Sequence, residues 1–199
     1  MERVERSGLP YEKKRIDRLY AKIPAKSHLL CYDEMGPIEL RPIHSRTWAR
    51  AAHPDRLPAT YTRPHGTRQW LAFLDTQCDH LWGYFRRRKT WRDLLQALTW
   101  MRSHYPLKER IYIIMDNFSP HLRPEILRWA RLNNVSLVWT PTNASWMNQI
   151  ECQFTELKEY VFGNSDYKSH QEVKTAVNDF LRYRNTRNAQ YKKTKLKRH

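Results

Sequence analysis

The sequence predicts an α/β domain built on a mixed five-stranded sheet. Five short apolar runs, rich in β-branched and aromatic residues, have the length and composition of strands. The first three follow one another without a helical segment between them, whereas amphipathic helical segments separate the last three. Two meander strands added to the first strand, followed by alternating helix and strand, give a sheet with both antiparallel and parallel pairs.

The first half of the chain supplies three of these strands. An apolar run over Ser27–Tyr32 ends at Asp33 and continues over Met35–Leu40 beyond a bend. A hairpin follows, formed by Thr67–Asp75 and His80–Arg86. The proline-rich, basic stretch 41–64 between them predicts a long functional loop.

The second half alternates helices with strands. Thr90 and Asp93 form a predicted capping box for the first of these helices. The expected elements are helix Thr90–His104, strand Arg110–Met115 ending at Asp116, helix Pro124–Asn133, strand Val135–Trp139, and helices Ser145–Phe162 and His170–Tyr183.

The ends of the chain are expected to lie outside this domain. Residues 1–25 are charged and predict a linker, residues 26–185 the folded domain, and residues 186–199 a frayed basic tail. Three separated cysteines in apolar stretches predict reduced, buried thiols. With no signal peptide and no membrane-spanning run, the sequence predicts a cytoplasmic, nucleoid-associated protein without a membrane partner.

The charge balance predicts a polyanionic partner. Lys and Arg total 36 against 20 Asp and Glu, which gives a formal net charge of +16. Double-stranded DNA is the first candidate, and a basic surface that serves solubility alone is the alternative.

Three carboxylates stand out by position. Asp33 and Asp116 each end a predicted buried strand, where an unpaired carboxylate is costly. Glu151 lies at the margin of an apolar helical stripe, so its carboxylate could reach the end of the sheet. Taken singly, each aspartate could form a turn, and Glu151 could be an exposed helical residue.

The strings CYDE, MDNFSPH and TPTNASWMNQIECQF around these residues resemble the catalytic core of DDE transposases, in the bacterial insertion-sequence branch related to mariner elements. Between Asp116 and Glu151 lie 34 residues, the spacing typical of that branch. The resemblance covers Lys26 to Asn185 and implies a ribonuclease-H-like fold.

The resemblance also implies a mechanism. Asp33, Asp116 and Glu151 would be catalytic and would hold two Mg²⁺ or Mn²⁺ ions, for which carboxylate oxygens are suited ligands. The implied activity is DNA strand cleavage and strand transfer at transposon ends, carried out by a homodimer. Loop 41–64 corresponds to the family's clamp loop, with Trp48 as the dimer contact.

Other positions are weaker candidates. Asn117, His121 and Asn148 are predicted to support the site, with turn or helix capping as the alternative and capping preferred for Asn148. A set of basic residues either contacts DNA or is merely solvated: Arg86, Arg87, Arg88, Lys89 and Lys158.

The sequence departs from the family pattern in three respects. Gln149 stands where the family often has Pro, and Phe154 where it often has Trp. About 25 residues precede the first strand, too few for the helix-turn-helix modules that recognise transposon ends. A non-catalytic DNA-binding remnant and another ribonuclease-H-like nuclease are therefore the alternative functions.

We also expect the three carboxylates to raise one another's pKa, so that Asp116→Asn does not destabilise the metal-free fold.

Overall fold

The five apolar runs form one mixed sheet. In a computed structural model, which describes residues 9–43 and 65–196, the strand order is β3-β2-β1-β4-β5. β1 pairs antiparallel with β2 and parallel with β4, β2 pairs antiparallel with β3, and β4 pairs parallel with β5. The strands are β1 (Ser27–Ile38), β2 (Arg68–Asp75), β3 (His80–Arg86), β4 (Arg110–Met115) and β5 (Val135–Trp139). The predicted mixed five-stranded α/β sheet is confirmed.

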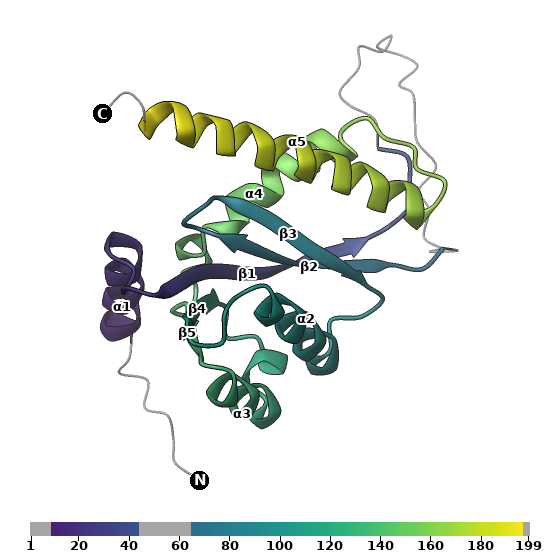
Figure 1. Cartoon of the computed structure of the whole chain (residues 1–199). Helices are drawn as coiled ribbons and strands as arrows, with labels where there is room; N and C mark the ends of the chain where they lie inside the picture. Colours follow the sequence, from purple (N-terminus) through teal and green to yellow (C-terminus); the bar gives the residue numbers. More distant parts are fainter. Residues whose placement is uncertain (1–8, 44–64, 197–199) are drawn as a thin grey trace.

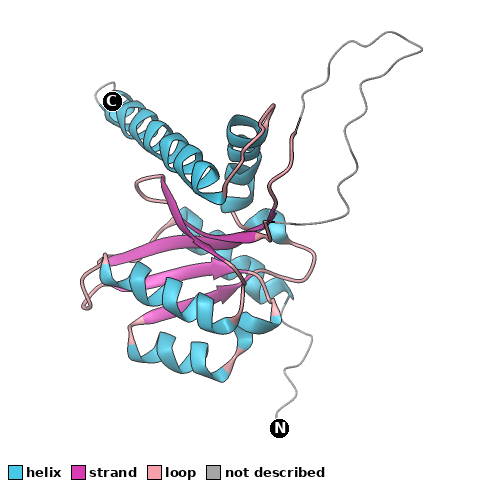
Figure 2. Ribbon diagram, turned by 90° about the vertical axis from the view of Figure 1, so that its right-hand side faces the viewer, coloured by secondary structure: helices cyan, strands magenta, loops and turns pink. Residues whose placement is uncertain are grey.

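Helices cover both faces of this sheet (Figures 1 and 2). α4 (Ile150–Leu157) and α5 (His170–Leu196) lie on one face, and α2 (Trp91–Ser103) and α3 (Pro124–Leu132) lie on the other. Strand alternation divides β1 between two cores. Cys31 and Met35 pack in the core on the α4 side, whereas Leu30 and Tyr32 pack in the core on the α2 side.

The predicted capping box of α2 is present. The Thr90 side chain accepts a hydrogen bond from the Asp93 amide, and the Asp93 side chain accepts one from the Thr90 amide at 3.0 Å. These two bonds satisfy amide donors that the helix itself leaves free.

The segment expected to be a linker contains a helix that belongs to the fold. α1 (Leu9–Ala21) buries Ile16 fully and leaves Leu19 only 8 % exposed, both in the core on the α4 side. Its Arg15 donates a hydrogen bond to the Ser136 hydroxyl of β5 at 2.8 Å. The linker expectation for this part was wrong, because two apolar residues three positions apart place one face of a polar helix against the sheet.

Two helices differ from their predicted extents. The predicted helix Ser145–Phe162 is divided into a 3₁₀ turn η2 (Ser145–Met147), α4, and a π-helical turn η3 (Lys158–Phe162). Asn148 has an extended backbone, with φ −90° and ψ 101°, and this interrupts the helix before α4. α5 continues to Leu196, so the backbone expected to be a frayed tail is helical as far as that residue.

The cysteine prediction was only partly correct. Cys31 is buried, whereas Cys78 and Cys152 are exposed, and none of the three forms a disulfide. Cys78 lies in the turn between β2 and β3, and Cys152 lies in the first turn of α4.

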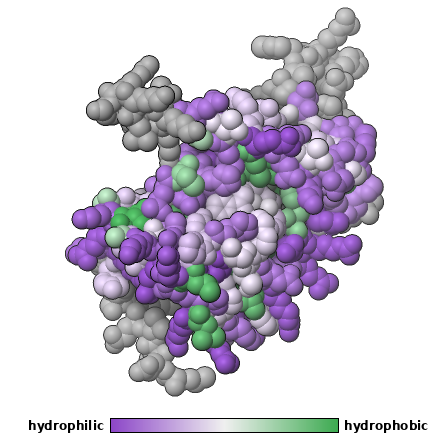
Figure 3. Space-filling model, viewed as in Figure 1, coloured by the Kyte–Doolittle hydropathy of each residue, from purple (hydrophilic) through white to green (hydrophobic). Residues whose placement is uncertain are grey.

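The surface is predominantly hydrophilic on the face shown in Figure 3, with small, separated apolar areas. Within residues 9–43 and 65–196, no helix combines the length and apolar character needed to cross a membrane. Trp48, the predicted dimer contact, lies outside the described residues.

Candidate active site

The parallel pairing of β1 and β4 brings Asp33 and Asp116 to the same level of the sheet, where β4 ends and β1 continues to Ile38. Cys31 pairs with Ile114, and the two aspartates each lie two residues beyond this pair. Because alternate residues of a strand face the same side, Asp33 shares the α4 side with Cys31. Glu151 stands in the first turn of α4, which packs on that side.

Asp33 is a half-buried carboxyl among other acids. Burial, together with the charges of Glu34, Asp116 and Glu151, raises its pKa to about 7. One backbone hydrogen bond opposes this shift, from the Glu34 amide to Asp33 Oδ1 at 2.7 Å. The three predicted catalytic carboxylates therefore share an electrostatic environment.

Asp116 behaves differently, because a histidine pairs with it. His121 Nδ1 lies 2.8 Å from Asp116 Oδ1, and the imidazole lowers the pKa of this carboxyl. Burial lowers the affinity of His121 for a proton, but its hydrogen bonds to Asp116 and Glu34 prevail and raise its pKa to about 9. The expectation of a raised pKa for Asp116 was wrong, because the imidazolium outweighs the neighbouring acids.

Glu34 is a part of the site that sequence reasoning missed. Its side chain is 6 % exposed and Oε1 lies 2.8 Å from His121 Nε2, while the Tyr32 hydroxyl donates to the same oxygen at 2.7 Å. Glu34 faces away from Asp33 by strand alternation, as predicted, yet His121 connects it to Asp116. The only signals in the sequence were the paired acids at 33–34 and a histidine five residues after Asp116.

Asn148 bonds to β1 and does not cap α4. It is 3 % exposed, and its Nδ2 donates to the Tyr32 carbonyl at 2.9 Å. The capping prediction was wrong because the extended backbone at Asn148 turns its side chain toward β1, and no side-chain cap is present at the start of α4. Its Oδ1 is buried and lacks a hydrogen-bond partner among the described residues.

Asn117 and Ser145 hold two loops at this edge. Asn117 Nδ2 donates to the Thr140 carbonyl at 2.9 Å, which ties the end of β4 to the end of β5. Ser145 Oγ donates to Glu151 Oε2 at 3.2 Å. The side-chain bond of Asn117 is thus structural, and it fixes the segment that begins at Asp116.

The predicted basic residues divide into two groups. The positive charge of Lys89 acts on Asp116, and its Nζ lies 4.6 Å from the Phe118 ring centroid, so this side chain is at the edge of the site. Arg87 and Arg88 are exposed, whereas Arg86 folds over the Tyr84 ring at 5.7 Å. The structure brings Lys89, but not Arg86, to the carboxylates.

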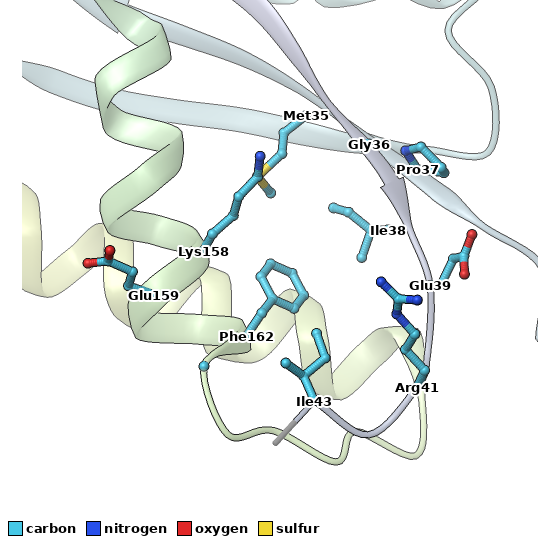
Figure 4. A pocket seen from close by; sticks show the side chains of 11 residues that line it. Met35, Gly36, Pro37, Ile38, Glu39, Arg41, Ile43, Lys158, Glu159 and Phe162 are labelled. Atoms are coloured by element: carbon cyan, nitrogen blue, oxygen red, sulfur yellow. The ribbon is translucent and has the colours of Figure 1, made fainter. Parts of the chain in front are cut away.

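Lys158 lines a cavity of about 900 Å³ that lies between the end of β1 and η3. Figure 4 shows Lys158 and Phe162 on the η3 side, with Ile38 on the β1 side. One lining residue of the cavity is Met35, which follows Asp33 by two positions on β1. Lys158 therefore lies in a cavity that adjoins the candidate site.

The donor set suits a hard divalent cation in its chemistry. It consists of carboxylates, and burial together with the charges of neighbouring acids raises the pKa of one of them, Asp33. In the described part of the chain, however, no three acids, histidines or cysteines converge closely enough to hold a metal ion. The metal-binding role of Asp33, Asp116 and Glu151 therefore remains a prediction.

Comparison with known proteins gives a family and a fold. Residues 28–174 match the family profile described as DDE superfamily endonuclease, and this range contains all three carboxylates. A search of curated proteins finds no relative that matches the chain.

Two solved structures of Mos1 transposase are similar to this chain. The Mos1 strand transfer complex has a TM-score of 0.65 at 10 % identity and covers 94 % of this chain and 60 % of the Mos1 chain. The mariner Mos1 paired-end complex with Mn has a TM-score of 0.63 at 11 % identity, with coverages of 94 % and 61 %.

A retroviral assembly is also similar. The intasome of simian T-cell lymphotropic virus, in complex with PP2A regulatory subunit B56 gamma, has a TM-score of 0.53 at 13 % identity. It covers 76 % of this chain and 47 % of the viral chain. This chain thus spans about half to three fifths of those proteins, and the likeness confirms the ribonuclease-H-like fold.

Proposed function

The chain belongs to the DDE superfamily of endonucleases, and we propose that it is a transposase catalytic domain of the insertion-sequence branch, which cuts and joins DNA at transposon ends. One observation carries this proposal. Asp116 follows the last residue of β4, Asp33 lies at the matching position of the parallel neighbour β1, and the charges of Asp116 and Glu151 both act on the half-buried Asp33 carboxyl.

Asp33, Asp116 and Glu151 would hold the Mg²⁺ or Mn²⁺ ions. When bound, two such ions make an oxygen nucleophile available near neutral pH and stabilise the leaving oxygen of a phosphodiester. The bound cations would also offset the repulsion among the three acids, which contributes to the raised pKa of Asp33.

The protein's own residues orient the ligands. His121 holds one oxygen of Asp116 and is itself held by Glu34, so the carboxylate has little rotational freedom. Such bonds to ligand side chains commonly decide metal affinity. Because Glu34 and Tyr32 bury the far side of the imidazole, this arrangement is rigid.

Positive charge would bind the phosphate backbone on either side of the carboxylates. Lys89, with Arg87 and Arg88 before it, lies on one side, and Lys158 lies on the other, in the cavity that extends from Met35. Phosphate contacts of this kind position DNA without reading its sequence. Sequence recognition and a homodimer contact through Trp48 would be supplied by parts of the protein outside this site.

Nicking of supercoiled plasmid DNA tests the proposal. The wild-type chain should nick in Mn²⁺ or Mg²⁺ and not in EDTA, and Asp116→Ala should nick no faster than the buffer control. Asp166→Ala is the matched control, because Asp166 is an exposed acid that pairs with Lys168. Nicking that persists in Asp116→Ala would refute the assignment, and a wild-type chain that binds DNA without nicking it would indicate a non-catalytic remnant.

A further inference from the structure

Tyr20 of α1 contacts the turn that leads into α4. Its hydroxyl donates to the Met147 carbonyl at 2.9 Å, and the Gln149 amide donates to the hydroxyl oxygen at 3.4 Å. The same oxygen lies 3.2 Å from Cys31 Sγ on β1. One hydroxyl therefore connects three segments: α1, the strand that carries Asp33 and the turn that precedes Glu151.

The hydrogen-bonding capacity of this hydroxyl is fully used. A tyrosine hydroxyl has one hydrogen to donate and two lone pairs to accept with. The hydrogen goes to Met147, so Cys31 must be the donor in its contact with Tyr20, and the Gln149 amide is the second donor. Replacing the hydroxyl by hydrogen would therefore remove all three bonds at once.

A second bond fixes the same turn from the other side. Asn148, between Met147 and Gln149, donates to the Tyr32 carbonyl. The turn is thus bonded to Tyr32 directly and to Cys31 through Tyr20, and these are the two residues before Asp33. Glu151 follows this turn by two residues and Asp33 follows these contacts by one, so the bonds join the two segments that carry these carboxylates.

α1, which carries Tyr20, is packed against the core of the domain. Ile16 and Leu19 are buried in the core on the α4 side, and Arg15 bonds Ser136 of β5. Burial also raises the pKa of Tyr20, so its hydroxyl keeps its hydrogen. α1 and α4 are therefore held against the same sheet, with Tyr20 between them.

We propose that Tyr20 is a positioning residue, whose hydroxyl sets the place of Glu151 relative to Asp33. This inference rests on the proposed function, since the spacing matters only if both carboxylates bind a cation. It assigns α1, which carries none of the three proposed metal ligands, a direct influence on the site.

Tyr20→Phe tests the inference, because it keeps the ring and removes only the hydroxyl. Tyr105→Phe is the matched control. Tyr105 is also half-buried, and its hydroxyl donates to Asp75 Oδ2 at 2.9 Å, away from the edge that carries Asp33. Tyr20→Phe loses three hydrogen bonds and Tyr105→Phe loses one, so thermal unfolding in EDTA is measured first to establish that both variants are folded. The full chain is then titrated with Mn²⁺ and followed by calorimetry, and plasmid nicking is measured at each Mn²⁺ concentration.

Tyr20→Phe should need about tenfold more Mn²⁺ for half-saturation, as expected when the support of a metal ligand is removed. Its nicking should fall at low Mn²⁺ and recover in part at high Mn²⁺, whereas Tyr105→Phe should follow the wild type in both assays. Equal Mn²⁺ affinity in the two variants would overturn the role of Tyr20. A wild-type chain that neither binds Mn²⁺ nor nicks would instead overturn the proposed function.

Discussion

His121 Nδ1 lies 2.8 Å from Asp116 Oδ1, while the other ring nitrogen is bonded to a buried glutamate, Glu34. One imidazole thus joins the two faces of the sheet at the edge where the candidate ligands lie. His121 thereby restrains Asp116, a candidate metal ligand. This structural role of His121 can be measured separately from catalysis.

His121→Gln should destabilise the protein and reduce nicking. The change removes the positive charge and leaves the buried Glu34 carboxylate, which is 6 % exposed, with the Tyr32 hydroxyl but without a charged partner. Breaking a buried pair in this way costs about 3 kcal/mol. We expect a decrease of that order in the free energy of unfolding in urea, and a further reduction in Mn²⁺ affinity.

His28→Gln is the control for this variant. His28 Nε2 lies 2.7 Å from Glu109 Oε2, but the two side chains are 24 % and 26 % exposed, and the pair is at the opposite end of β1. We expect a decrease of about 1 kcal/mol or less for a pair that water can reach. Similar decreases in the free energy of unfolding for the two variants would show that the burial of Glu34 does not raise the cost of losing its histidine partner.

Asp33→Asn should stabilise the metal-free protein above neutral pH. The pKa of Asp33 is about 7 in the folded protein, against about 4 in an unfolded chain. The stability that follows from this difference is present below pH 4 and is lost as pH rises through 7. Asn keeps the acceptor for the Glu34 amide and has no charge, so the variant should be more stable than the wild type at pH 8, by on the order of 2 kcal/mol.

The comparison across pH separates charge from packing. In EDTA, thermal unfolding of Asp33→Asn and the wild type should coincide below about pH 4, diverge between about pH 4 and pH 7, and keep a constant difference above pH 7. Asp116→Asn should instead be less stable than the wild type at pH 8. His121 lowers the pKa of Asp116, so the ionised carboxylate stabilises the folded protein. If Asp33→Asn is less stable than the wild type at pH 8, its carboxylate is not repelled by its neighbours.

The sequence predicted the sheet well and the support of the site poorly. The bounds of β3, β4 and β5 agree with the apolar runs because turn residues delimit each run. Glu34 and His121 are 87 positions apart, so no local pattern reveals their contact. The contribution of α1 was missed for a related reason: Ile16 and Leu19 are a small apolar signal within a charged helix.

Arg184→Leu should destabilise the protein strongly. Arg184 is 1 % exposed on α5 and donates to Asp79 Oδ1 at 2.7 Å and, through Nε, to Gln153 Oε1 at 2.9 Å. It joins the β2–β3 turn, α4 and α5, and its replacement leaves several acceptors without a donor. We expect a decrease of about 3 kcal/mol or more in the free energy of unfolding in urea.

Arg182→Leu is the matched variant on the same helix. Arg182 pairs with Asp179 at 3.0 Å, but their side chains are 78 % and 58 % exposed. An exposed pair of this kind contributes little, so unfolding should be within about 1 kcal/mol of the wild type. Equal effects of the two substitutions would contradict the role of Arg184 as the link between these three segments.

Lys89→Gln should weaken DNA binding by the same factor for every sequence. The charge of Lys89 lies beside Asp116, where a scissile phosphate would approach. Removing one ion pair with a phosphate should reduce the salt dependence of affinity by about one unit in the logarithmic slope.

Lys108→Gln changes the net charge equally, but Lys108 is exposed between α2 and β4, at the opposite end of the sheet. Binding to random and candidate terminal-repeat duplexes over a salt series compares the two variants. A slope unchanged in Lys89→Gln would place the DNA path elsewhere, and a preference above about a hundredfold for one duplex would mean that this chain reads bases.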